Sequence, residues 1–157
     1  MNIEIDINEV IFLKEFELGW RWEKTHNSNI SEIEKQQIQP VSKTESKRLY
    51  KIVKYFETEQ NLVEKYSQTD WISASAENEI KIQRFRNQLE TILESWNEEI
   101  IISWHRNITL KTTKEIFLKY WTDFLYPSSD DVTIISEKTN WIIFYRHFEV
   151  AKIWTKK

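Results

Sequence analysis

The chain contains no cysteine among its 157 residues, which excludes disulfides, thiol catalysis, iron–sulfur clusters and cysteine-based zinc sites. It has one glycine, Gly19, whereas phosphate-binding loops and dinucleotide fingerprints need several glycines at fixed spacing. No stretch approaches the roughly 20 apolar residues that cross a bilayer. The first residues are acidic, where a signal peptide would be basic. We therefore expect a cytoplasmic protein without a cofactor and without a membrane partner.

What the chain has in abundance is aromatic residues. Eight Trp, eight Phe and six Tyr accompany 40% hydrophobic and 30% charged residues, a composition typical of one folded domain over residues 1–157. We expect some of these aromatic side chains to be exposed. The net charge is −3, with an acidic excess in residues 1–40 and a basic excess in residues 101–157. No dense basic stripe stands out, so the sequence predicts no nucleic-acid partner.

Helical periodicity of apolar residues appears in three segments, 43–57, 76–97 and 112–127. The first and third begin with a capping box, Ser42 with Glu45 and Thr112 with Glu115, whose side chains can bind free backbone N–H groups. The polar residues 24–42 predict a long surface loop with one helical turn after Ser31.

Runs of β-branched and aromatic residues predict strands at 132–136, 141–145 and 148–154, which would form a C-terminal β-meander. The run at 99–104 predicts either a buried strand or the end of the preceding helix. Alternating apolar residues at 3–7 and 16–22 predict two N-terminal strands, and a short helix over 8–16 is the alternative. Together these segments indicate an α+β fold, with three to four helices packed on a mostly antiparallel sheet.

One hypothesis for a site involves the histidines, His26, His105 and His147. None has the sequence spacing of a helix-borne metal site, and the simpler interpretation is a surface or partly packed side chain. A small hydrolase or metal-dependent enzyme would need His105, His147 and Asp130 or Asp131 brought together by the fold. The simpler interpretation of Asp130 and Asp131 is that they cap the turn after Pro127.

A second hypothesis is a protein-binding surface, because large rigid aromatic side chains beside charged residues are typical interface anchors. The residues that we expect in it are Trp20, Trp22, Trp121, Asp123, Asp130 and Asp131. Core packing is the common alternative for each aromatic residue. A symmetric interface in a homodimer is a further alternative.

The segment from Tyr120 to Val132, with Trp141 and the pair Tyr145 and His147 downstream, resembles small uncharacterised bacterial proteins associated with immunity against polymorphic toxins. The resemblance covers about the last 50 residues and carries over no catalytic residue. It implies a bacterial protein that binds a partner toxin and occludes its surface, and that is not an enzyme. Small size, mild acidity and the lack of cysteine agree with this expectation.

Overall fold

The computed structural model describes residues 3–23 and 28–157. Within these residues, five α-helices accompany one eight-stranded sheet. The α-helices are α1 (Glu32–Lys35), α2 (Lys43–Glu57), α3 (Glu79–Ile92), α4 (Lys114–Lys119) and α5 (Trp121–Phe124). The strands are β1 (Gln39–Pro40), β2 (Tyr66–Gln68), β3 (Ile72–Ser73), β4 (Glu99–His105), β5 (Ile108–Thr113), β6 (Val132–Ser136), β7 (Trp141–Arg146) and β8 (Val150–Lys156). Short 3-10 helices are η1 (Ile7–Glu9), η2 (Leu13–Glu15), η3 (Gly19–Trp22) and η5 (Glu59–Asn61).

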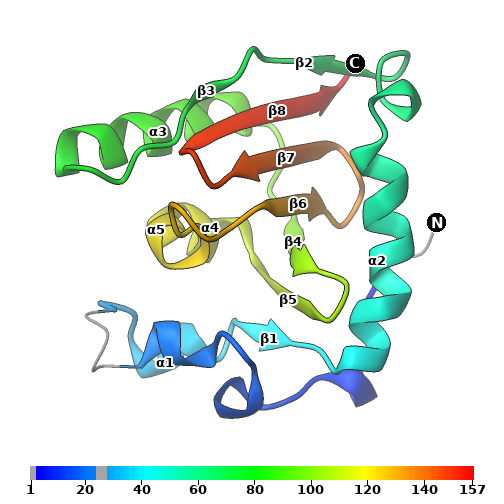
Figure 1. The fold of residues 1–157 in the computed structure, drawn as a ribbon, viewed down its shortest axis with the longest axis vertical. Helices are drawn as coiled ribbons and strands as arrows, with labels where there is room; N and C mark the ends of the chain where they lie inside the picture. Colours follow the sequence, from blue (N-terminus) through cyan, green and yellow to red (C-terminus); the bar gives the residue numbers. More distant parts are fainter. Residues whose placement is uncertain (1–2, 24–27) are drawn as a thin grey trace.

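The sheet is antiparallel, in the order β1-β5-β4-β6-β7-β8-β2, and β3 also pairs with β8 (Figure 1). The predicted α+β class and antiparallel sheet are confirmed. Five α-helices stand where three to four were expected, because the segment 112–127 is divided and the turn after Ser31 forms α1. No described helix is both long and apolar enough to cross a membrane.

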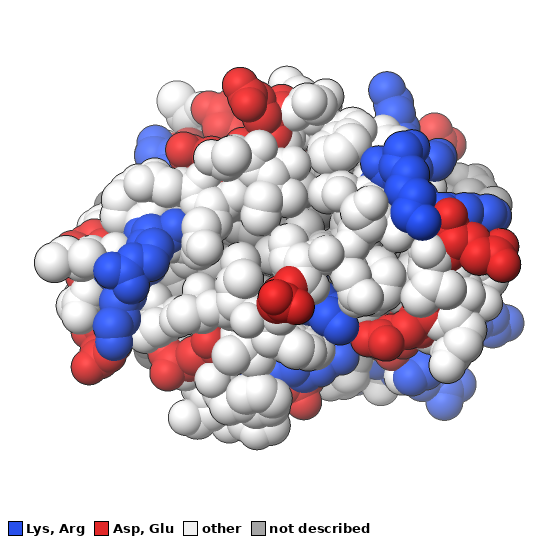
Figure 2. All heavy atoms as spheres, turned by 90° about the horizontal axis from the view of Figure 1, so that it is seen from above, with Lys and Arg blue, Asp and Glu red and all other residues white. Residues whose placement is uncertain are grey.

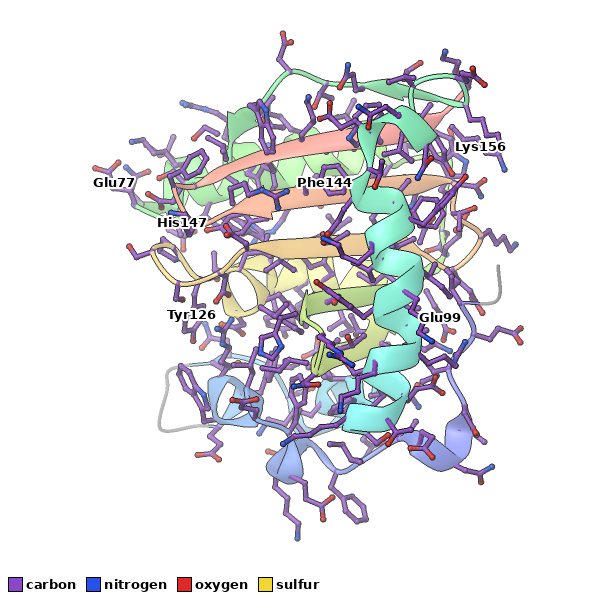
Figure 3. All side chains as sticks on the ribbon, turned by 45° about the vertical axis from the view of Figure 1, so that its right-hand side comes forward. Glu77, Glu99, Tyr126, Phe144, His147 and Lys156 are labelled. Atoms are coloured by element: carbon purple, nitrogen blue, oxygen red, sulfur yellow. The ribbon has the colours of Figure 1, made fainter. Side chains whose placement is uncertain are left out.

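Helices cover both faces of the sheet. In Figure 3, α2 lies in front of the strands, while α3, α4 and α5 lie behind them. Leu49, Val53 and Phe56 of α2 pack in one cluster with strand residues such as Ile101 and Phe144. The opposite face carries the larger cluster, which includes residues of α3, α4, α5 and η3.

Burial on both faces explains the continuous apolar runs of the central strands. In β7, Ile142 and Phe144 face α2, whereas Trp141, Ile143 and Tyr145 belong to the opposite cluster. Antiparallel strands more often expose one face and alternate apolar with polar residues. In β6 and β7 both faces are covered over most of the strand, so nearly every residue is buried.

The helix at 43–57 has the predicted bounds, and the Ser42 hydroxyl accepts a hydrogen bond from the Glu45 N–H at 3.2 Å. The third predicted helix begins differently. Thr113, and not Thr112, caps it by accepting from the Ile116 N–H, because β5 continues through Thr113, which pairs with Glu99, and the helix begins only at Lys114. Strand β5 pairs with the full length of β4, and this pairing outweighs the local capping signal.

The two predicted N-terminal strands are absent from the described residues and were wrong. Ile3 is buried against α2, but Ile7 begins η1 and is exposed. Residues 16–18 form a turn and residues 19–22 form η3 instead, which Gly19 permits. A Cβ at Gly19 would lie only 2.0 Å from the Leu13 carbonyl oxygen, so the chain can fold back on itself only without a side chain there.

Candidate functional site

At one end of the sheet, the loops that follow β4 and β7 lie beside the loops that precede β6 and β8. We call the exposed and half-exposed side chains there the strand-end surface, which consists of Trp20, Trp71, Tyr126, Asp131, His147 and Phe148. Figure 3 shows Tyr126 and His147 on the same side of the molecule. The loop after α5 is joined to the β7–β8 turn by the Ser128 N–H, which donates to the His147 carbonyl oxygen at 2.8 Å.

A buried ion pair fixes η3 beneath this surface. The Arg21 guanidinium donates to both carboxylate oxygens of Asp130, from Nη1 at 2.7 Å and from Nη2 at 3.0 Å. Both side chains are nearly inaccessible to water. Two parallel, charge-assisted bonds in a dry site define the relative position of segments 109 residues apart in the sequence.

Asp130 also accepts hydrogen bonds from the loop around it. The donors are the Tyr126 N–H at 2.9 Å, the Ser129 hydroxyl at 3.0 Å and the Trp104 indole N–H at 3.3 Å. Burial alone would raise the pKa of Asp130, but these bonds and Arg21 outweigh it and hold the pKa below its usual range. Asp130 is therefore ionised at neutral pH and serves as the central acceptor of the loop.

Aromatic rings enclose the Arg21 guanidinium. Its central carbon lies 3.9 Å from the ring centre of Tyr126 and 5.6 Å from that of Trp20, within the range of cation–π attraction. Trp20 and Tyr126 also contact each other edge to face, with ring centres 5.7 Å apart. Trp20 keeps 39% of its surface exposed, so a rigidly held indole is presented to solvent.

Asp123 lies close to this cluster on α5. Its carboxylate accepts a hydrogen bond from the Ser28 hydroxyl at 2.9 Å, which ties the N-terminal segment to α5. Removal from water raises the pKa of Asp123, and the Ser28 bond and the nearby Arg21 charge only partly oppose this. Asp123 thus differs from Asp130, whose bonds prevail over burial.

On the other side of the loop, Asp131 holds His147. One carboxylate oxygen accepts from the His147 backbone N–H and contacts the ring Nδ1, both at 3.0 Å. Burial raises the pKa of Asp131, but the bonds to His147 prevail and the pKa lies below its usual range. The imidazole in turn meets the Phe148 ring edge to face at 5.2 Å, and Phe148 is 65% exposed.

A polar hollow of about 310 Å³ opens beside α2 at the same end of the sheet. Its lining residues are Tyr50, Glu57, Ser103, Trp104, His105, Asp131, Thr133 and Arg146. The Thr133 hydroxyl donates to Glu57 at 2.9 Å, and within the described chain the buried Ser103 hydroxyl has no hydrogen-bond partner. Carboxylates, a guanidinium and hydroxyl groups could bind a polar group of a ligand here.

The residues predicted for partner binding are divided by the fold. Trp22 and Trp121 are buried, against Phe124 and Phe85 respectively, and Asp130 is buried with Arg21. These three residues belong to the interior and support the surface from below. Trp20 and Asp131 are exposed, and Asp123 is half-buried.

The residues predicted for an enzyme are brought together only in part. His105 and Asp131 line the same hollow, and Asp131 contacts His147. Asp130 points to the opposite side of the loop, toward Arg21. The Nδ1 of His105 accepts from its own turn, from the Asn107 N–H at 3.1 Å. His26 lies outside the residues that the structure describes. Among the described residues, no three acidic or histidine side chains lie close enough together to hold a metal ion.

Sequence reasoning missed Arg21, Trp71 and Phe148. Trp71 is 45% exposed and lies between β2 and β3, near the guanidinium of Arg146 and the ammonium of Lys152. Its segment, 66–76, contains a single charged residue. Figure 2, which looks down on the edge formed by β2 and β3, shows a mostly uncharged surface with a few charged side chains near its centre and more at its margins. The scarcity of charged residues in segment 66–76 is the sequence feature that could have indicated an exposed Trp71, because exposed sheet edges usually carry charged residues.

We compared the chain with protein families, with curated proteins and with solved structures, and no match was found in any of the three.

Proposed function

We propose that this is a bacterial immunity-type protein, which binds a partner toxin through the strand-end surface and occludes it. The observation that carries the proposal is the set of exposed aromatic side chains held on rigid supports at this end of the sheet. Trp20 is fixed by Arg21 and Tyr126, and Phe148 is fixed by His147. The resemblance of residues 120–132 to small bacterial proteins that are associated with toxin immunity agrees with the proposal.

Rigid presentation favours tight binding because little side-chain freedom remains to be lost on association. Trp and Tyr dominate binding energies when they fill pockets at the centre of an interface. Asp131 and His147 add polar groups around the aromatic residues, as in the rim of a typical interface. The surface thus combines apolar anchors with directional hydrogen-bonding groups.

The experiment is co-expression with the protein encoded beside this gene, with growth as the first readout and calorimetric binding of the two purified proteins as the second. We expect the chain to restore growth and to bind in a one-to-one complex. Trp20→Ala and Phe148→Ala should each weaken binding by roughly 30-fold, the effect of losing about 2 kcal/mol at a central anchor.

Phe12→Ala is the matched control, because Phe12 is similarly exposed but is not part of the strand-end surface. It should leave binding unchanged. A neighbouring protein that is harmless and does not bind would refute the immunity function. Binding that survives Trp20→Ala and Phe148→Ala together would refute the assignment of the surface.

Self-association is a second candidate, supported by the sheet edge at β2 and β3, whose segment 66–76 contains a single charged residue. An unprotected edge can pair with the same edge of another copy. Light scattering distinguishes the candidates, since a homodimer would be twice the mass of the 19.2 kDa chain. Gln68→Lys would place a charge on the edge and dissociate such a dimer, without effect on a toxin bound at the strand-end surface.

A further inference from the structure

A broad groove of about 760 Å³ follows the outer side of α2, apart from the strand-end surface, with which it shares no residue. Its lining residues are Thr44, Lys47, Arg48, Tyr50, Lys51, Lys54 and Arg106. Five of these seven residues are cationic and none is acidic. Such a concentration of one charge is unexpected in a chain whose net charge is −3.

The fold assembles this groove from two distant segments. Lys47, Lys51 and Lys54 recur at helical spacing, so they line one side of α2 over about 10 Å of its axis. Arg106 comes from the turn between β4 and β5, more than fifty residues later. When the charge is summed over residues 41–70, the acidic residues of this segment nearly cancel these cations. The sequence therefore predicted no basic surface.

Several of these charges are not neutralised internally. Lys54 pairs with Glu57 at 2.9 Å, and Arg48 pairs with the buried Glu45. Within residues 3–23 and 28–157, Lys47, Lys51 and Arg106 make no ion pair. Like charges held together without counter-charges repel one another, and a bound polyanion relieves that repulsion.

The arrangement fits a linear chain of phosphates better than a folded acidic protein. The cations are spread along the groove on flexible side chains, and no exposed Trp, Phe, Leu or Met lines it as a protein-binding anchor. The one aromatic residue is Tyr50, whose ring centre lies 5.8 Å from the Lys54 ammonium. A stacking ring beside backbone-binding cations is the usual combination in sites for single-stranded nucleic acid.

We infer that the groove along α2 binds single-stranded nucleic acid, with the lysines and Arg106 on the phosphates and Tyr50 against a base. This inference does not depend on the immunity function, because the groove and the strand-end surface share no residue, although Tyr50 lines both the groove and the polar hollow that contains Asp131. The expected binding is weak in sequence preference and strongly dependent on salt, since it rests on the release of counterions from the phosphates.

The test is fluorescence anisotropy with labelled oligothymidine and oligouridine dodecamers at low salt. Lys47→Glu with Lys51→Glu should weaken binding at least tenfold. It should also reduce the slope of log affinity against log salt by about 0.7 for each lost phosphate contact. Tyr50→Leu should weaken binding by roughly tenfold with an unchanged slope, because it removes stacking and no charge.

Lys14→Glu with Arg84→Glu is the matched control, because it changes the net charge equally on exposed residues outside the groove. Circular dichroism should show that all variants are folded. Equal weakening by the control pair, or no binding by the wild type, would overturn the proposal. Competition by polyglutamate as effective as that of unlabelled oligonucleotide would overturn it too and would assign the groove to an acidic protein.

Discussion

Asp130→Asn is expected to lower the free energy of unfolding by about 3–5 kcal/mol at neutral pH, the usual cost of removing one partner from a buried ion pair. The substitution keeps the size of the side chain but leaves the Arg21 guanidinium buried without its counter-charge. The substitution also places an amide NH₂ group at the position of a carboxylate oxygen that accepts hydrogen bonds. The Tyr126 N–H and an Arg21 nitrogen contact the carboxylate at 2.9 Å and 2.7 Å, and an amide nitrogen cannot accept either bond.

The companion substitution, Arg21→Met, distinguishes the charge effect from simple loss of packing. In the double variant no stranded cation remains, and an apolar side chain of similar length occupies the space among the rings around Arg21. We therefore expect the double variant to be more stable than Asp130→Asn alone, because replacing a whole buried pair is far less costly than breaking it. The coupling energy should be about 2 kcal/mol or more in magnitude.

Urea unfolding followed by tryptophan fluorescence and by circular dichroism measures these changes. With a slope of about 2 kcal/mol per molar urea, a loss of 3 kcal/mol moves the midpoint by about 1.5 M. A loss below about 1 kcal/mol for Asp130→Asn would mean that water reaches the pair and would refute its burial. Strictly additive effects of the two substitutions would refute the coupling.

The effect also has a pH dependence with a definite sign. Because the pKa of Asp130 is lowered by folding, its ionised form contributes stability above the pKa of the unfolded chain, about 3.9. That contribution is lost as the pH falls from there through the folded-state pKa. The stabilities of the wild type and of Asp130→Asn should therefore approach each other in acid, and a constant difference at every pH would contradict this.

Three further predictions concern single positions. Gly19→Ala should destabilise the fold by about 1–3 kcal/mol, because its Cβ would meet the Leu13 carbonyl oxygen, and a wild-type urea midpoint would contradict the close approach. Asp123→Asn should stabilise the protein at pH 7, because folding raises the pKa of this carboxyl and so disfavours its charged form. The gain in stability should vanish in acid, where the wild-type carboxyl is protonated. Calorimetric unfolding at both pH values measures the difference. Tyr145→Phe should change the stability by less than about 1 kcal/mol, because no described group bonds the buried hydroxyl, and a larger loss in thermal unfolding would reveal a missing partner.

The sequence was most informative where one local signal acted alone. The helix over 43–57 has Ser42 as its N-cap and an apolar face, and its bounds were predicted correctly. The second half of the predicted capping box does not form, because the Glu45 carboxylate accepts from the Asp6 N–H and the Ser42 N–H donates to the Glu9 carbonyl oxygen. The strands at 132–136 and 141–145 were identifiable because β-branched and aromatic residues are concentrated in them, as is usual for strands that are buried on both faces. At 112–113, by contrast, pairing with β4 decided which threonine caps the helix.

The candidate site was less predictable, because exposure depends on which segments cover one another. Among the tryptophans proposed as anchors, Trp20 is partly exposed while Trp22, two residues later, is buried, since a 3-10 turn and not a strand orients them. The partner of Arg21 could not be inferred, because Asp130 and Asp131 are adjacent and only the fold turns one inward. Phe148 was expected to begin the strand 148–154, but β8 begins at Val150 and Phe148 lies in the turn before it, where its ring is exposed.

By itself, the sequence determined the class of fold, the main helices and central strands, and the absence of cysteine chemistry, because these follow from composition and local periodicity. Only the tertiary structure decided which aromatic side chains reach solvent, which aspartate binds Arg21, and that Arg106 joins the lysines of α2. The physical reason is the same in each case. Burial and charge clustering are sums over neighbours in space, and most of those neighbours lie far apart along the chain.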